Sequence, residues 1–167
     1  MIGKCICSST LRDCFKGSSV DNTDMDLASG VAAFEAKEFR RALQLLQPLA
    51  ENGHAEAQYR LAVQYQAGLG VVPNQLQAYR WMREAAEQSH ELALHGLGIM
   101  YLYGECVEKN ELEAARWLKR AADRGLAGSM AALAGMYEQG LGVERNARKA
   151  RELYEAAGFA GEPPSLD

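Results

Sequence analysis

Residues 55–90 read AEAQYRLAVQYQAGLGVVPNQLQAYRWMREAAEQSH, residues 91–126 read ELALHGLGIMYLYGECVEKNELEAARWLKRAADRGL, and residues 127–162 read AGSMAALAGMYEQGLGVERNARKARELYEAAGFAGE. The three stretches are 36 residues long each and align without a gap. Self-similarity at a fixed period of this size is the signature of repeat architectures. The identical positions are Leu61, Leu97 and Leu133; Tyr65, Tyr101 and Tyr137; Gly68, Gly104 and Gly140; Val71, Val107 and Val143; Asn74, Asn110 and Asn146; Ala78, Ala114 and Ala150; and Ala85, Ala121 and Ala157.

Each copy predicts a helix, a loop and a second helix. In the first copy, Ala57, Leu61, Ala62 and Tyr65 recur at helical spacings of three and four. Gly68 follows the last turn, where a left-handed residue ends a helix without strain at Cβ. The first helix of each copy is therefore expected to stop at this glycine.

The loop carries a second glycine, for which we expect a positive φ. It is Gly70 in the first copy and Gly142 in the third, whereas Cys106 occupies the same position in the second. The cysteine puts the same loop geometry in doubt there.

The second helices are expected to begin at the repeated asparagines, which are good N-caps. Gln77 follows Asn74 and Glu113 follows Asn110 at the spacing of a reciprocal capping box. The predicted ends of the second helices are Gly53, Ser89, Gly125 and Gly161.

The repeated pattern A-x-x-x-L-A/G-x-x-Y-x-x-G-x-G-V-x-x-N-x-x-x-A-x-x-W-x-x-x-A-A resembles the Sel1-like repeat family. The resemblance implies an all-α, right-handed α/α superhelical solenoid of about eight helices. Residues 25–54 form a degenerate unit that resembles a tetratricopeptide repeat, with Ala36, Lys37 and Glu38 as a shorter connection. The expected organisation is a flexible tail over 1–24, this capping unit over 25–54, repeats over 55–90, 91–126 and 127–162, and a mobile tail over 163–167.

Charge and hydropathy exclude several function classes. With 18 basic and 22 acidic residues the chain carries a net charge of −4, which disfavours nucleic-acid binding. No apolar run reaches the length of a membrane span and no secretory signal is evident, so we expect a cytoplasmic protein without membrane insertion.

The N-terminal tail concentrates three of the four cysteines, Cys5, Cys7 and Cys14. Their spacing lacks a second C-x2-C pair, so a polar tail is favoured over a zinc or copper site. Met25 stands directly before the first helical pattern and is an alternative translation start. We expect no cofactor and no metal.

Family members act mostly as adaptors in protein complexes, so the resemblance implies a protein partner bound on the concave face that the first helices line. Positions that vary between copies are expected to point into this groove, because a partner is not itself periodic. The alternative is that Leu102 and Tyr103 pack against the loop of the next copy. The candidate partner-binding residues are Phe34, Tyr59, Val63, Gln66, His95, Ile99, Leu102, Tyr103 and Glu138.

The histidines do not form a catalytic or metal-binding motif. His54 and His90 precede first helices, where we expect them to cap the backbone, and His95 stands alone in the groove. No nucleophile elbow or P-loop occurs. We therefore expect a non-catalytic adaptor, monomeric with weak self-association at most. An immunity-type inhibitor of one partner enzyme is the alternative, and a hydrolase using the groove histidine is a remote one.

Overall fold

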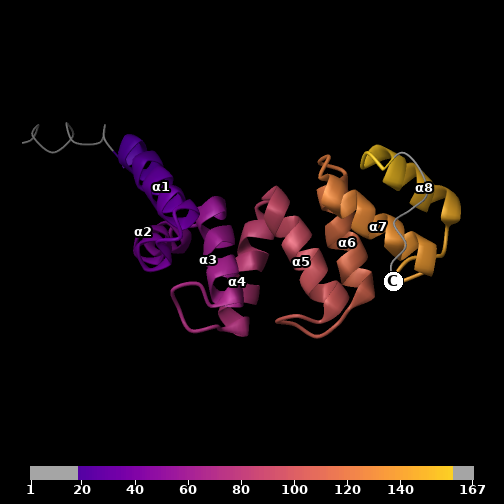
Figure 1. Cartoon of the computed structure of the whole chain (residues 1–167), viewed down its shortest axis with the longest axis horizontal. Helices are drawn as coiled ribbons and strands as arrows, with labels where there is room; N and C mark the ends of the chain where they lie inside the picture. Colours follow the sequence, from indigo (N-terminus) through magenta and orange to yellow (C-terminus); the bar gives the residue numbers. More distant parts are fainter. Residues whose placement is uncertain (1–18, 160–167) are drawn as a thin grey trace, which may run out of the picture.

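Eight α-helices, joined by short loops, make up the part of the chain that the computed structural model describes, residues 19–159. They follow one another in a row from α1 to α8 (Figure 1). The helices are α1 Ser19–Glu35, α2 Phe39–Glu51, α3 Ala55–Ala67, α4 Gln75–Glu87, α5 Glu91–Tyr103, α6 Glu111–Ala122, α7 Ala127–Gln139 and α8 Ala147–Ala156.

Each helix packs on the helix before it and the helix after it, so the chain is a stack of helix pairs. The pairs α3–α4, α5–α6 and α7–α8 coincide with the three repeats, and α1–α2 is the upstream unit. An all-α solenoid of sequential pairs is therefore confirmed. Helix α1 begins at Ser19, upstream of the expected boundary at 25, and Cys5, Cys7 and Cys14 lie outside the described residues.

The core runs along the stack because small residues let neighbouring helices approach. Leu61, Leu97 and Leu118 are fully buried, among many buried alanines. A Cβ added to Gly98 in α5 would lie 2.7 Å from Leu118 Cγ in α6. This close approach explains why the column that holds alanine in the other two repeats holds glycine here.

The first helices α3, α5 and α7 end at the predicted glycines, Gly68, Gly104 and Gly140, which all adopt a left-handed conformation. Cys106 also takes a positive φ of 63°, close to the 72° of Gly70 and the 64° of Gly142. The loop geometry is therefore kept in the second repeat despite the cysteine. A Cβ on Gly142 would collide with the backbone carbonyl of Glu111, so the loop of one repeat lies directly on the second helix of the repeat before it.

The asparagine caps are confirmed, but the reciprocal capping box is not. The side chains of Asn74, Asn110 and Asn146 accept hydrogen bonds from the backbone N–H three residues later. The N–H of each asparagine donates instead to the backbone carbonyl of the repeated tyrosine, as Asn110 does to Tyr101 at 2.9 Å. This bond joins the two helices of a repeat, so the return bond from Gln77 or Glu113 is not needed.

The predicted ends of the first three second helices are confirmed. The residues there, Gly53, Ser89 and Gly125, each have a positive φ. The prediction of Gly161 for the last repeat is wrong. Helix α8 ends at Ala156, and Gly158 adopts the positive φ of 90°. Phe159 then packs edge-on against Tyr154, with ring centroids 6.2 Å apart. The residue with the positive φ thus comes three positions earlier than predicted.

Candidate functional site: the first-helix face

The outward-facing side chains of α1, α3, α5 and α7 form one surface, which we call the first-helix face. Its predicted members are all half-buried or exposed, and so accessible at least in part. Their contacts divide them into residues that join neighbouring repeats and residues that remain free. That division decides which of them are available to a partner.

Glu56 and Tyr59 of α3 both contact His90, which precedes α5. His90 Nδ1 accepts a hydrogen bond from the Ala93 N–H at 3.3 Å, so its Nε2 carries the proton and donates to Glu56 Oε2 at 2.7 Å. The Tyr59 ring stacks on the His90 ring at a centroid distance of 5.0 Å. This hydrogen bond is the main reason that the pKa of Glu56 is lowered to about 2, and Arg60 contributes to the same shift. Tyr59 thus belongs to a junction between repeats.

The two histidines that precede first helices differ. His90 caps α5 as predicted, whereas His54 makes no side-chain cap to α3. His54 Nδ1 is buried without a hydrogen-bond partner. The capping role predicted for His54 is therefore wrong.

Phe34, Val63 and Gln66 continue the face toward α1. Arg60 lies over the Phe34 ring, 4.9 Å from its centroid, and Phe34 also meets Phe39 edge-on. Gln66 is exposed, and its Nε2 donates to Glu105 in the next repeat at 3.2 Å. Phe34 and Gln66 are thus engaged in contacts within the stack, while Val63 is half-buried.

His95 of α5 lies against Ser129 of α7. Its Nδ1 is 2.8 Å from Ser129 Oγ, and burial lowers the pKa of the imidazole. Ser129 is fully buried, with no exposed surface. The pair links the second and third repeats, and the serine hydroxyl is closed to any substrate.

Leu102 and Tyr103, at the end of α5, differ in how far they are buried. Leu102 is half-buried, and both Leu102 and Ile99 pack against the core of the third repeat. Tyr103 is 68% exposed. Leu102 therefore packs against the next repeat, whereas Tyr103 remains free to contact a partner.

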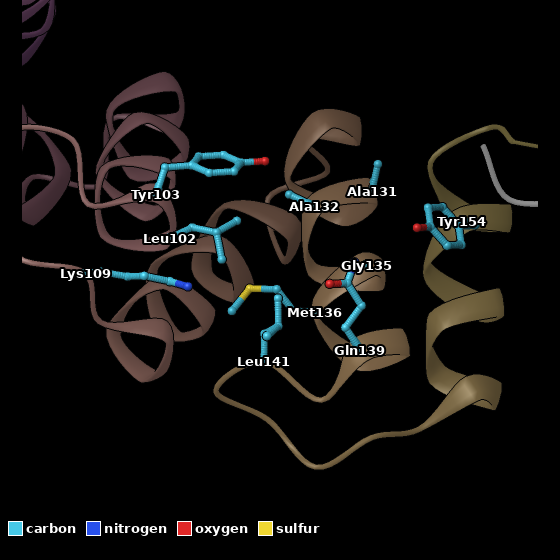
Figure 2. Close-up of a pocket in the computed structure, with 10 residues that line it drawn as sticks. All are labelled: Leu102, Tyr103, Lys109, Ala131, Ala132, Gly135, Met136, Gln139, Leu141 and Tyr154. Atoms are coloured by element: carbon cyan, nitrogen blue, oxygen red, sulfur yellow. The ribbon is translucent and has the colours of Figure 1, made fainter. Parts of the chain in front are cut away.

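A cavity of about 460 Å³ opens between α5, α7 and α8. Figure 2 shows Tyr103, Leu102 and Lys109 on one side, α7 in the middle and Tyr154 on the other side. The lining is mostly apolar. It consists of Leu102, Tyr103, Lys109, Ala131, Ala132, Gly135, Met136, Gln139, Leu141 and Tyr154, and we call it the Tyr103 pocket.

The Tyr103 pocket exists because the third repeat has small residues where the others have large ones. The position of Tyr59 and His95 holds Ala131, and the position of Val63 and Ile99 holds Gly135. This loss of side-chain volume is visible in the aligned copies, and it is the signal by which the pocket could have been found from sequence.

Glu138 lies beside Tyr154 at the edge of the pocket. Burial is the larger cause of the raised pKa of Tyr154, and the nearby Glu138 carboxylate adds to it. Lys109 forms an ion pair with Glu111 at 2.8 Å, so its charge is already matched. Among residues 19–159, no lysine or arginine side chain forms an ion pair with Glu138 or Glu105.

Three further exposed apolar side chains were not among the predicted residues. Val72, Leu76 and Leu112 are 80%, 71% and 53% exposed at the loop edge of the stack. The signal was leucine in the first turn of two second helices, where the third repeat has Arg148.

Four arginines of the second helices, Arg80, Arg83, Arg116 and Arg148, have acidic partners about one turn away. Arg80 pairs with Glu84, and Arg83 with Glu87, at 2.9 and 2.8 Å. Among the described residues, no three His, Cys, Asp or Glu side chains gather to hold a metal ion. None of the described helices is long and apolar enough to cross a bilayer.

Comparison with known proteins agrees with the helix pairs. The family model described as Sel1 repeat matches residues 36–54, 55–90, 92–126 and 127–158. No protein among the curated sequences matches the chain.

Two solved structures are similar over most of the chain. One is c5321, a protective antigen of uropathogenic Escherichia coli strains with an SLR fold, at 30% identity and a TM-score of 0.78 over 84% of this chain and 31% of that one. The other is a Sel1 repeat protein from Oxalobacter formigenes, at 29% identity and a TM-score of 0.76 over 81% of this chain and 54% of that one. Helicobacter pylori cysteine rich protein B shares the fold at 19% identity and a TM-score of 0.50, over 87% of this chain and 94% of that one. The chain thus spans about a third and about half of the length of the first two.

Proposed function

Because the chain belongs to the Sel1 repeat family, whose repeats generally mediate protein–protein interactions, we propose that it is a non-catalytic adaptor that binds a segment of a partner protein on its first-helix face. The observation that carries this proposal is the exposure of Tyr103 beside an apolar pocket. Tyrosine is enriched among the residues that dominate binding energy at interfaces. An exposed ring next to unfilled apolar surface is typical of a binding site.

The contacts of the face support a scaffold that is rigid before it binds. Glu56–His90, Gln66–Glu105 and His95–Ser129 each join one repeat to the next. A surface whose geometry is fixed in advance loses less conformational entropy when it binds. The exposed Tyr103 takes no part in these junction contacts and is available to a partner.

The absence of catalysis is part of the proposal, and the buried position of Ser129 supports it. A serine nucleophile must reach the substrate, and Ser129 Oγ faces only the protein interior beside His95. The immunity-type inhibitor and the cytoplasmic location stay predictions from the sequence. An inhibitor would hold one enzyme in a tight one-to-one complex and abolish its activity.

Affinity capture from the native cell tests the proposal. Immobilised wild type is compared with Tyr103→Ala, which deletes the exposed ring, and with Leu112→Ala, which deletes an exposed apolar side chain at the loop edge. We expect a specific protein to be retained by wild type and Leu112→Ala and to be lost with Tyr103→Ala. Loss with Leu112→Ala alone would place the interface on the loop edge and contradict the proposal.

A further inference from the structure

The two layers of the stack differ in charge. Within their bounds, α1, α3, α5 and α7 carry seven acidic residues and one basic residue, Arg60. Helices α2, α4, α6 and α8 carry ten basic and seven acidic residues. The first-helix layer is therefore negative and the second-helix layer is positive, although the whole chain has a net charge of only −4.

The acidic excess extends to the neighbourhood of the Tyr103 pocket. Glu138 borders it at Tyr154, and Glu105 follows Tyr103 by two residues. Lys109 is matched by Glu111, and the guanidinium of Arg145 donates to the backbone carbonyl of Glu138 at 3.0 Å rather than pairing with its carboxylate. Neither carboxylate forms an ion pair within residues 19–159, although Glu105 accepts a hydrogen bond from Gln66 of α3, so the negative charge of both can still attract a cation brought by a ligand.

The pocket itself fits a large apolar side chain. Leu102, Met136 and Leu141 provide apolar walls, and the rings of Tyr103 and Tyr154 flank them (Figure 2). Its volume of about 460 Å³ lies within the range of natural binding pockets. The aromatic rings favour an anchor of the size of leucine, phenylalanine or tryptophan.

We propose that the Tyr103 pocket binds a basic segment of a partner protein, which inserts one large apolar side chain between Tyr103 and Tyr154 and places lysine or arginine near Glu105 and Glu138. The inference rests on the proposed function and narrows it to one pocket and one partner chemistry. Attraction between a basic segment and the acidic face speeds encounter and fixes orientation. The apolar anchor supplies most of the affinity.

Selection from a random dodecapeptide phage library on the immobilised full chain tests this. We expect the selected pool to be enriched in lysine and arginine around a leucine, phenylalanine or tryptophan. A synthetic peptide from the pool should bind more weakly as salt is raised, because the carboxylates are screened. The variant Ala131→Tyr restores the tyrosine that the first repeat has at this position. It should lower the affinity for the peptide by about tenfold or more, because the ring fills the pocket.

The matched control is Ala127→Tyr, in the first turn of the same helix and outside the pocket, which should bind as wild type does. Circular dichroism and thermal melting establish that both variants fold. A pool that binds Ala131→Tyr as well as wild type, yet loses binding with Tyr103→Ala, overturns the pocket inference and leaves the proposed function standing. An acidic pool overturns the charge assignment.

Failure to select any peptide counts against both the inference and the proposed function. Sedimentation of the wild type and of Ala131→Tyr tests whether a second copy of the chain occupies the pocket instead. A dimer that dissociates on the substitution would mean that a second copy fills the pocket, and it would overturn the proposal.

Discussion

Glu56 shows how a single side chain couples two repeats, since its carboxylate accepts a hydrogen bond from His90 across the junction and pairs with Arg60 on its own helix. Its pKa of about 2 in the folded chain is below the 4.5 of the free side chain, so the unfolded chain binds the proton more readily. Stability from this group is therefore present above about pH 4.5 and is lost as the pH falls toward 2. Because 28% of the side chain is exposed, we expect about 2 kcal/mol rather than the full value of the shift.

The substitution Glu56→Gln tests this coupling. We expect the variant to be less stable than wild type at pH 7, and the difference to shrink as the pH is lowered from 5 to 3. Urea unfolding at several pH values measures it. A constant difference at all of these pH values would mean that the carboxylate charge does not act across the junction.

Gly142 illustrates a residue whose identity is set by the neighbouring repeat. Its φ of 64° alone makes alanine costly by about 1 kcal/mol, and a Cβ would also meet the Leu112 backbone nitrogen at 2.7 Å. We expect Gly142→Ala to lower the free energy of unfolding by at least 2 kcal/mol. Gly53→Ala is the matched control, because Gly53 has a φ of 89° with nothing within 4 Å of a Cβ. If urea unfolding showed the same loss of unfolding free energy for Gly142→Ala and Gly53→Ala, the loop would not be in close contact with α6.

At the scale of the elements, helix pairs depend on small residues at their contacts. A Cβ on Gly98 would lie 2.7 Å from Cγ and 3.2 Å from the backbone nitrogen of Leu118, which is fully buried and has little room to move. We expect Gly98→Ala to destabilise the chain by about 1 to 3 kcal/mol despite the better helix propensity of alanine. Thermal and urea unfolding measure the change.

Gly128→Ala in α7 is the control for this prediction. Its Cβ would meet His95 Cε1 at 3.7 Å, an ordinary contact, so the change should be neutral or stabilising by a few tenths of a kcal/mol. A loss at Gly128 equal to that at Gly98 would mean that the α5–α6 contact is not specially close.

The sequence predicted the helix pairs, their glycine ends and their asparagine caps, because these depend on local chemistry repeated at a fixed period. It did not predict the end of α8. Phe159 packs on Tyr154, an aromatic contact between two positions that hold no aromatic residue in the other two copies. The capping box failed for a related reason, since the Asn110 N–H reaches the Tyr101 carbonyl across the repeat.

The candidate site was predicted as a set of positions, without its contacts. The period identified which columns face outward, and Leu102 and Tyr103 do line one pocket with α7. It gave no means of knowing that Tyr59 stacks on His90 or that His95 meets a buried Ser129. Those contacts join residues about 30 positions apart, and they depend on how one repeat is set on the next.

At the scale of the whole molecule, the stack presents two chemically different sides. The first-helix face combines acidic charge with the Tyr103 pocket, and the second helices carry arginines paired with glutamates. If binding uses the first-helix face, the affinity of the partner must fall with rising salt, because exposed carboxylates are screened within about 10 Å at 0.1 M. Titration of the captured partner at 50 and 300 mM salt measures this, and an affinity that rises with salt would contradict it.

The central claim, that a partner protein docks beside Tyr103, is tested most directly by photo-crosslinking in the native cell. A photoreactive phenylalanine analogue is placed at position 103, or at position 116 in α6, where Arg116 is exposed on the second-helix side. We expect position 103 to give one discrete adduct with another protein and position 116 to give none. An adduct from position 116 alone, or none from position 103 while the partner is still captured, would contradict the assignment of the first-helix face as the interaction surface.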